Sequence, residues 1–132
     1  MTEETLDIIV VDDDDEIRDV IRITLETKGF KVRTAKNGVE ALTEIERSIP
    51  DVFISDIEMP ELDGLHLIEE IREREEWCSI PVIMVSGLTS DSKRSELSWA
   101  RDLHVQAFIG KPFNPMKLLE AMENIMDKRK KR

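Results

Sequence analysis

The chain has 132 residues, of which 29 are acidic and 19 basic, and its formal net charge is −10. This length fits one domain of ordinary size, the 40% of apolar residues can build a core, and so acidic a body is a poor binder of DNA or anionic membranes. A single cysteine, Cys78, excludes a disulfide framework, and every apolar run is far shorter than the ~20 residues that span a bilayer, so the cytoplasm is the expected compartment.

Apolar residues follow two periods that alternate along the chain. Short runs such as Ile8–Val11 are typical of strands covered on both faces, whereas spaced stripes such as Ile17 to Leu25 are typical of helices. In chain order the pattern predicts a strand at 8–11, a helix at 17–25, a strand at 32–35, a helix at 41–49, a strand at 52–55, a helix at 65–71, a strand at 81–85, a helix between 90 and 103, a strand at 107–109 and a helix at 116–126. Five strands alternating with five helices indicate right-handed crossovers and an α/β fold, with a parallel sheet between two helical layers.

Polar side chains gather where four of the predicted strands end. The acidic run Asp12–Glu16 follows the first strand, Asp56 ends the third, Ser86 ends the fourth and Lys111 follows the fifth. In a doubly wound sheet the carboxyl ends of the strands meet at one edge, where ligands bind. We therefore expect several carboxylates, a hydroxyl and an ammonium group to share one site.

Crowded carboxylates limit the chemistry of such a site. They cannot all stay ionised unaided, so they recruit a cation or become protonated. Oxygen ligands in an incomplete protein shell suit Mg²⁺, and the ammonium of Lys111 can balance the remaining negative charge. A carboxylate beside a divalent ion, a hydroxyl and a lysine is a workable acceptor for a phosphoryl group.

Each of these signals has a simpler explanation when taken alone. Asp14, Asp15 and Glu16 fit the cap and first turn of a helix. Lys111 alone fits a solvated surface residue, and Ser86 alone fits a turn. Their coincidence at four strand ends favours a functional site.

Four segments carry a resemblance to a known family. They are residues 8–13 (Ile-Ile-Val-Val-Asp-Asp), 55–64 (Ser-Asp-Ile-Glu-Met-Pro-Glu-Leu-Asp-Gly), 85–87 (Val-Ser-Gly) and 111–113 (Lys-Pro-Phe). Their order and spacing resemble those of the receiver domains of two-component response regulators, from about Leu6 to the end of the last helix. The resemblance implies a flavodoxin-like, doubly wound five-stranded parallel sheet of order 2-1-3-4-5 with five helices.

The resemblance also implies roles for the acidic residues. Asp56 would accept a phosphoryl group from a phosphohistidine and would be one ligand of Mg²⁺. Asp13 would bind the ion directly, Asp12 mainly through water, and Glu58 through its backbone carbonyl.

Three further residues would respond to the phosphoryl group. Ser86, where Thr is also common, would donate its hydroxyl to a phosphoryl oxygen, Lys111 would pair with the phosphoryl group, and Phe108 would be the aromatic residue that rotates inward. The surface formed by the fourth helix, the fifth strand and the fifth helix would then change shape, and it is also a surface through which two copies could dimerise. Glu58 and Leu88 stand where side chains tune the lifetime of the phosphoryl group.

The implied function is a switch that turns over no substrate beyond its own phosphorylation and dephosphorylation. Its expected partners are a sensor histidine kinase or a histidine phosphotransfer protein, and a downstream target protein or an output domain outside this sequence. No contact with a membrane and no direct contact with nucleic acid are expected. Residues 1–127 would form the receiver domain, and residues 128–132 a basic C-terminal tail (Lys-Arg-Lys-Lys-Arg).

Three alternatives stay open at this point. The chain could be an intermediate that passes phosphate to a histidine phosphotransfer domain, a degenerate receiver that only binds a partner, or a Mg²⁺-dependent phosphatase with an Asp nucleophile. The basic tail fits a solvated helix end or the start of a linker, and a nucleic-acid patch fits it less well.

Overall fold

A computed structural model describes residues 5–56, 64–86, 104–110 and 114–130 of the chain. Its five strands form one parallel sheet in the order β2-β1-β3-β4-β5, as expected. The strands are β1 (Asp7–Val11), β2 (Lys31–Ala35), β3 (Val52–Asp56), β4 (Val82–Ser86) and β5 (Ala107–Gly110).

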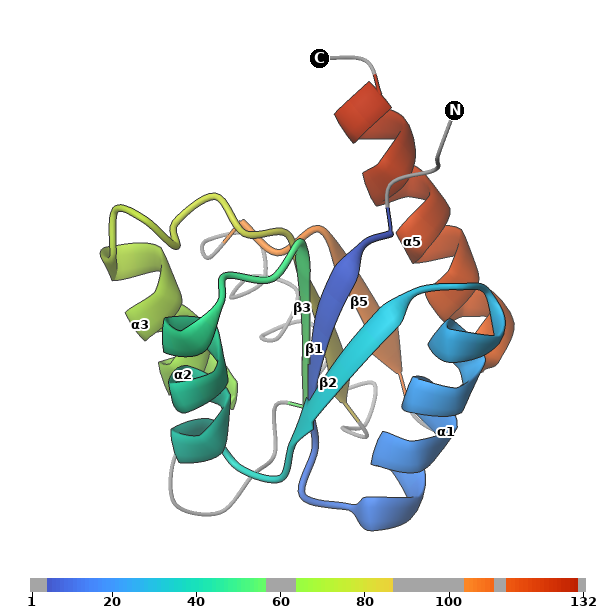
Figure 1. Cartoon of the computed structure of the whole chain (residues 1–132), viewed down its shortest axis with the longest axis horizontal. Helices are drawn as coiled ribbons and strands as arrows, with labels where there is room; N and C mark the ends of the chain where they lie inside the picture. The colour runs from blue at the N-terminus through green and yellow to red at the C-terminus, as the bar shows by residue number, and fades with distance from the viewer. Residues whose placement is uncertain (1–4, 57–63, 87–103, 111–113, 131–132) are drawn as a thin grey trace.

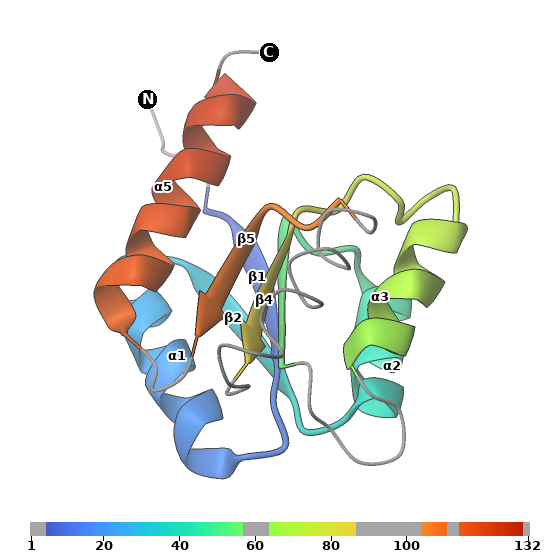
Figure 2. The same ribbon diagram turned by 180° about the vertical axis from the view of Figure 1, so that it is seen from behind.

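Helices cover both faces of this sheet. They are α1 (Asp15–Thr27), α2 (Gly38–Arg47), α3 (Gly64–Glu73) and α5 (Pro115–Lys130). Helices α1 and α5 lie on one face, and α2 and α3 lie on the other (Figures 1 and 2). The helix predicted between residues 90 and 103 falls outside the described residues.

The helix ends follow local capping chemistry. The Asp14 carboxylate accepts hydrogen bonds from the backbone N–H groups of Glu16 and Ile17, which caps α1. Asn37 caps α2 in the same way through Glu40 N–H, so α2 begins earlier than its apolar stripe. It ends at Arg47, before the predicted limit of residue 49, because Ser48 has already turned to an extended conformation.

The alternation of side chains along the strands divides the core into two layers. Ile9, Phe53 and Met84 belong to the layer under α2 and α3, whereas Ile8 and Ile54 belong to the layer under α1 and α5. All five side chains are fully buried. This explains the unbroken apolar runs in the sequence, since a parallel sheet covered on both faces has no solvent-facing side.

Arg72 joins α3 to the end of the sheet where the strands begin, opposite the end that carries Asp12 and Asp56. Its guanidinium donates hydrogen bonds to the backbone carbonyls of Ile80, at 2.7 Å, and Cys78, at 3.0 Å, and to that of His104, at 3.1 Å. Burial lowers the pKa of Arg72. These contacts join the segments that precede β4 and β5.

Nothing in the described helices is both long and apolar enough to cross a membrane.

Candidate metal centre at the carboxyl edge of the sheet

Three carboxylates meet where β1 and β3 end. Val11 pairs with Ser55 in the register of the two parallel strands, so the next residues, Asp12 after β1 and Asp56 at the end of β3, lie side by side. Carboxylate oxygens of Asp12, Asp13 and Asp56 all lie within 4.8 Å of one another. The structure therefore brings together three of the residues that were predicted to bind Mg²⁺, and they come from two separate segments.

The three carboxylates differ in their exposure to solvent. Asp12 and Asp56 are 1% and 2% exposed, whereas Asp13 is exposed. Buried like charges at this separation repel one another strongly, and a divalent cation relieves that repulsion. Carboxylate oxygens with one solvent-facing member fit Mg²⁺, which prefers oxygen ligands and retains several waters.

The acidic residues that follow β1 have two separate structural roles. Asp12 and Asp13 belong to the carboxylate cluster, whereas Asp14 caps α1 and Asp15 contacts Arg18 on the first turn of that helix. The prediction of a helix cap is confirmed for Asp14.

Hydrogen bonds hold the Asp12 peptide on several sides. Its backbone N–H donates to the carbonyl of Ala35 at 3.2 Å, and its carboxylate accepts from Asp14 N–H at 2.9 Å. Its carbonyl accepts from a guanidinium nitrogen of Arg18 at 2.9 Å. No sequence pattern indicates this last contact, because the spacing of Arg18 indicates only an ion pair with Asp15.

The backbones of Ser86 and Phe108 lie where the sequence pattern predicted. Ser86 is the last residue of β4 and pairs with Gly110, while Phe108 pairs with Met84 within the sheet. Lys111 and Glu58 lie outside the described residues. The roles of these four residues stay predictions.

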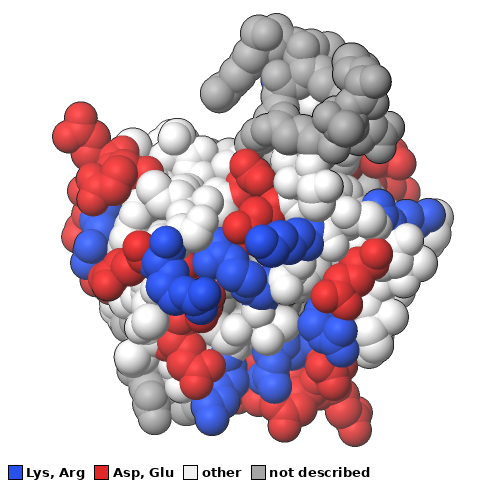
Figure 3. Space-filling view, viewed as in Figure 1, with Lys and Arg blue, Asp and Glu red and all other residues white. Residues whose placement is uncertain are grey.

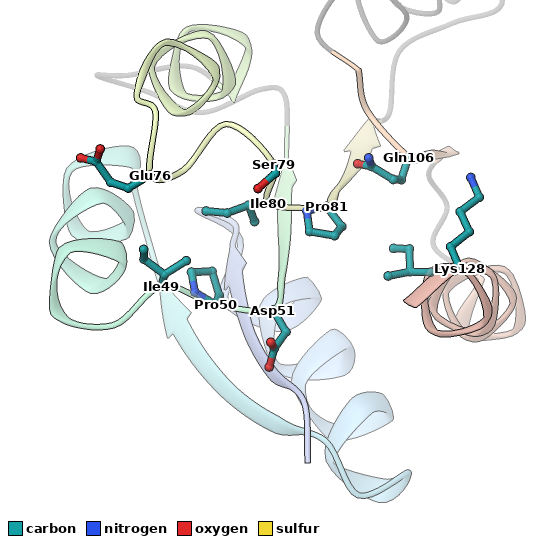
Figure 4. Close-up of a pocket in the computed structure, with 10 residues that line it drawn as sticks. Ile49, Pro50, Asp51, Glu76, Ser79, Ile80, Pro81, Gln106 and Lys128 are labelled. Carbon is teal, nitrogen blue, oxygen red and sulfur yellow. The ribbon is translucent and has the colours of Figure 1, made fainter. Parts of the chain in front are cut away.

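The opposite edge of the sheet carries a groove of about 270 Å³. It is lined by residues that precede β3, β4 and β5, among them Asp51, Pro81 and Gln106, and by Ile125 and Lys128 of α5 (Figure 4). Because these residues lie at the starts of the strands, the groove is separate from the carboxylate cluster.

Ion pairs account for part of the remaining acidic charge. Acidic and basic side chains lie interspersed on the face seen in Figure 3. Glu44 contacts both Arg33, at 3.3 Å, and Arg47, at 3.1 Å, and Arg22 contacts Glu26 at 2.8 Å. Most such pairs are solvated, so they contribute little to stability individually.

Proteins of known sequence or structure are similar to this chain over most of its length. The chain is 36% identical over 118 residues to an uncharacterised 14.6 kDa protein of Leptolyngbya boryana, covering 89% of this chain and 88% of that protein. It is 34% identical over 121 residues to the chemotaxis protein CheY1 of Helicobacter pylori, covering 90% and 95%. The crystal structure of the chemotaxis response regulator CheY4 of Vibrio cholerae superposes with a TM-score of 0.83 at 30% identity, covering 92% of this chain and 99% of that one.

Relatives of this chain differ in overall length. The chain spans only 52% of the response regulator Rre1 of Synechocystis, to which it is 32% identical. The family model for the response regulator receiver domain matches residues 8–123, nearly the whole chain. The chain therefore belongs to the family of response regulator receiver domains, which act as phosphoryl acceptors.

Proposed function

We propose that the chain is a phosphorylation-controlled switch in which Asp56 accepts a phosphoryl group from a phosphohistidine. The observation that carries this proposal is the position of the Asp56 carboxylate, which is buried at the end of β3 with oxygens of Asp12 and Asp13 within 4.8 Å. A sensor histidine kinase or a histidine phosphotransfer protein supplies the phosphohistidine.

The transfer step needs only one nucleophile from this chain. An oxygen of the ionised Asp56 carboxylate attacks the phosphorus atom in line with the leaving imidazole. The new P–O bond forms as the P–N bond breaks, and the imidazole nitrogen leaves with the bonding electron pair and takes up a proton. Hydrolysis of the acyl phosphate by water later returns Asp56 to its carboxylate form.

Mg²⁺ would be held by the carboxylates of Asp12, Asp13 and Asp56 and by the backbone carbonyl of Glu58. When bound, the ion neutralises charge that accumulates on the phosphoryl oxygens. The chain's own residues do the rest: the sheet edge orients the Asp56 carboxylate, and the burial of Asp12 and Asp56 limits the access of water.

The response to phosphorylation would pass through Ser86, Lys111 and Phe108. Ser86 and Lys111 would contact the phosphoryl oxygens, and Phe108 would rotate inward as Ser86 moves. Residues 1–127 would form the switching unit. Its output would go to a separate partner or to an attached domain; this chain covers 95% of the length of CheY1, whereas Rre1 is about twice as long.

Labelling by acetyl phosphate tests this proposal directly. With Mg²⁺ present, intact mass spectrometry should show the gain of one phosphoryl group on the wild-type chain and none on Asp56→Asn. Asp14→Asn is the matched control: it also removes one negative charge from the acidic edge but lies outside the carboxylate cluster and keeps the helix cap. Asp14→Asn should label like wild type. Equal labelling of Asp56→Asn, or no labelling of wild type, would contradict the proposal.

A further inference from the structure

We propose that Arg18 is a positioning residue for the divalent-cation site. In this inference its guanidinium holds the peptide of Asp12, so that the Asp12 carboxylate stays beside those of Asp13 and Asp56. The inference rests on the proposed function, because it assumes that these carboxylates bind the cation.

Arg18 reaches back from α1 to the end of β1. One terminal nitrogen, Nη1, donates to the Asp12 carbonyl at 2.9 Å, and the other, Nη2, contacts the carboxylate of Asp15. The Arg18 side chain is 17% exposed, against 82% for Asp15, so the guanidinium lies against the protein. Its planar shape lets the two nitrogens serve two acceptors at fixed directions.

The position of Asp12 explains why this contact matters for the site. The chain leaves β1 at Val11 and enters α1 at Asp15, so residues 12–14 must make the whole turn. Ala35 and Asp14 bind the N–H and the carboxylate of Asp12, and Arg18 binds its carbonyl. Hydrogen bonds at its N–H, its carbonyl and one carboxylate oxygen restrict the rotation of Asp12, which preorganises the carboxylate for a cation.

Charge and geometry predict opposite effects when Arg18 is removed. A guanidinium beside a cation site repels the cation, so Coulomb forces alone predict tighter Mg²⁺ binding after its removal. Loss of positioning predicts weaker binding, because the Asp12 carboxylate must then be ordered when the cation binds. The sign of the change in affinity therefore separates the two explanations.

Arg22 provides a matched control on the same helix. It lies one turn beyond Arg18 and contacts Glu26 at 2.8 Å and Asp19 at 3.6 Å. Arg22→Met removes the same charge and the same kind of side chain from α1 as Arg18→Met, and it leaves the hydrogen bonds of the Asp12 peptide intact.

The experiment is calorimetric titration of the metal-free full chain with Mg²⁺, with urea unfolding of each variant as a check on the fold. Arg18→Met should weaken Mg²⁺ binding by about tenfold or more, as loss of a group that orients a metal ligand does. Arg22→Met should stay within about twofold of wild type, because charge at a solvated pair is screened. Wild-type or tighter affinity in Arg18→Met would overturn the inference.

Arg18→Lys decides the matter if Arg18→Met does not fold. It keeps the positive charge but replaces the planar, two-branched donor by a single ammonium group, so the affinity for Mg²⁺ should fall below that of wild type. Unchanged affinity in Arg18→Lys would then overturn the inference. Wild-type protein that binds no Mg²⁺ would overturn both this inference and the proposed cation site, whereas Mg²⁺ binding that Arg18 does not affect would overturn this inference alone.

Discussion

Replacing Asp56 with Asn should make the metal-free protein more stable. Carboxylate oxygens of Asp12, Asp13 and Asp56 lie within 4.8 Å of one another. Two unit charges at that separation repel each other by about 3 kcal/mol when the effective dielectric constant is about 20. Asn has nearly the same shape as Asp, so the variant removes this repulsion without leaving a cavity.

The size of the gain depends on how well solvent screens each pair. Asp12 and Asp56 are both buried, so salt screens their repulsion only weakly, whereas the exposed Asp13 contributes less. The ammonium of Lys111, expected nearby, would offset part of the repulsion in wild type. We therefore expect the free energy of unfolding to rise by about 1–3 kcal/mol in the variant.

Urea unfolding followed by tryptophan fluorescence measures this gain, since Trp77 is buried and becomes exposed on unfolding. In buffer with a chelator, Asp56→Asn should unfold at higher urea than wild type. Added Mg²⁺ should narrow the difference in urea midpoint between the two proteins. Wild type binds the ion more tightly, so the ion stabilises the folded state of wild type by more than that of the variant. Asp14→Asn should show neither effect.

Two results would refute this reasoning. One is a variant that is less stable than wild type in the presence of chelator, which would mean that contacts of the Asp56 charge outweigh its repulsion. The other is an equal gain from Mg²⁺ in both proteins, which would mean that Asp56 takes no part in cation binding.

Substitutions at three further residues test the interactions that stabilise the fold. Arg33→Met should lower the free energy of unfolding by about 2 kcal/mol, because this guanidinium joins the carboxylate of Asp7 to the carbonyl of Glu44 at the end of α2; an unchanged urea midpoint would show that the bridge is not stabilising. Leu25→Ala should cost about 3 kcal/mol through the cavity it leaves, since Leu25 is fully buried, and a thermal midpoint equal to that of wild type would contradict this. Asp14→Ala should cost about 1 kcal/mol through loss of the α1 cap, whereas Asp14→Asn should cost almost nothing; equal losses in the two variants, measured by circular dichroism melts, would argue against the cap.

Much of the fold was predictable because its signals are local. The unbroken run Ile8–Val11 and the stripe from Ile17 to Leu25 each reflect the faces that one element buries, and the structure has β1 and α1 there. Because strands alternate with helices along the chain, each crossover connection places the next strand parallel to the one before it. The meeting of Asp12 and Asp56 then follows from their places at two strand ends.

The separate roles of the acidic residues that follow β1 were less predictable. Asp13 and Asp14 are adjacent and chemically identical, yet Asp13 joins the carboxylate cluster and Asp14 caps α1. Which of the two roles each residue takes depends on how the chain turns between β1 and α1. That turn is set partly by the contact of Asp12 with Ala35 of a different strand.

The sequence by itself therefore determined the kind of each described element, its order and the residues at the strand ends, because hydrophobic period and chain connectivity act over short distances. Only the tertiary structure decided which partners charged side chains take beyond the neighbours on their own helix. Arg18 binds the Asp12 carbonyl, and Arg33 binds Asp7, which is 26 residues away. The Arg33 contact exists only after separate segments pack together, and the Arg18 contact exists only once the turn between β1 and α1 has formed, so hydrophobic period predicts neither contact.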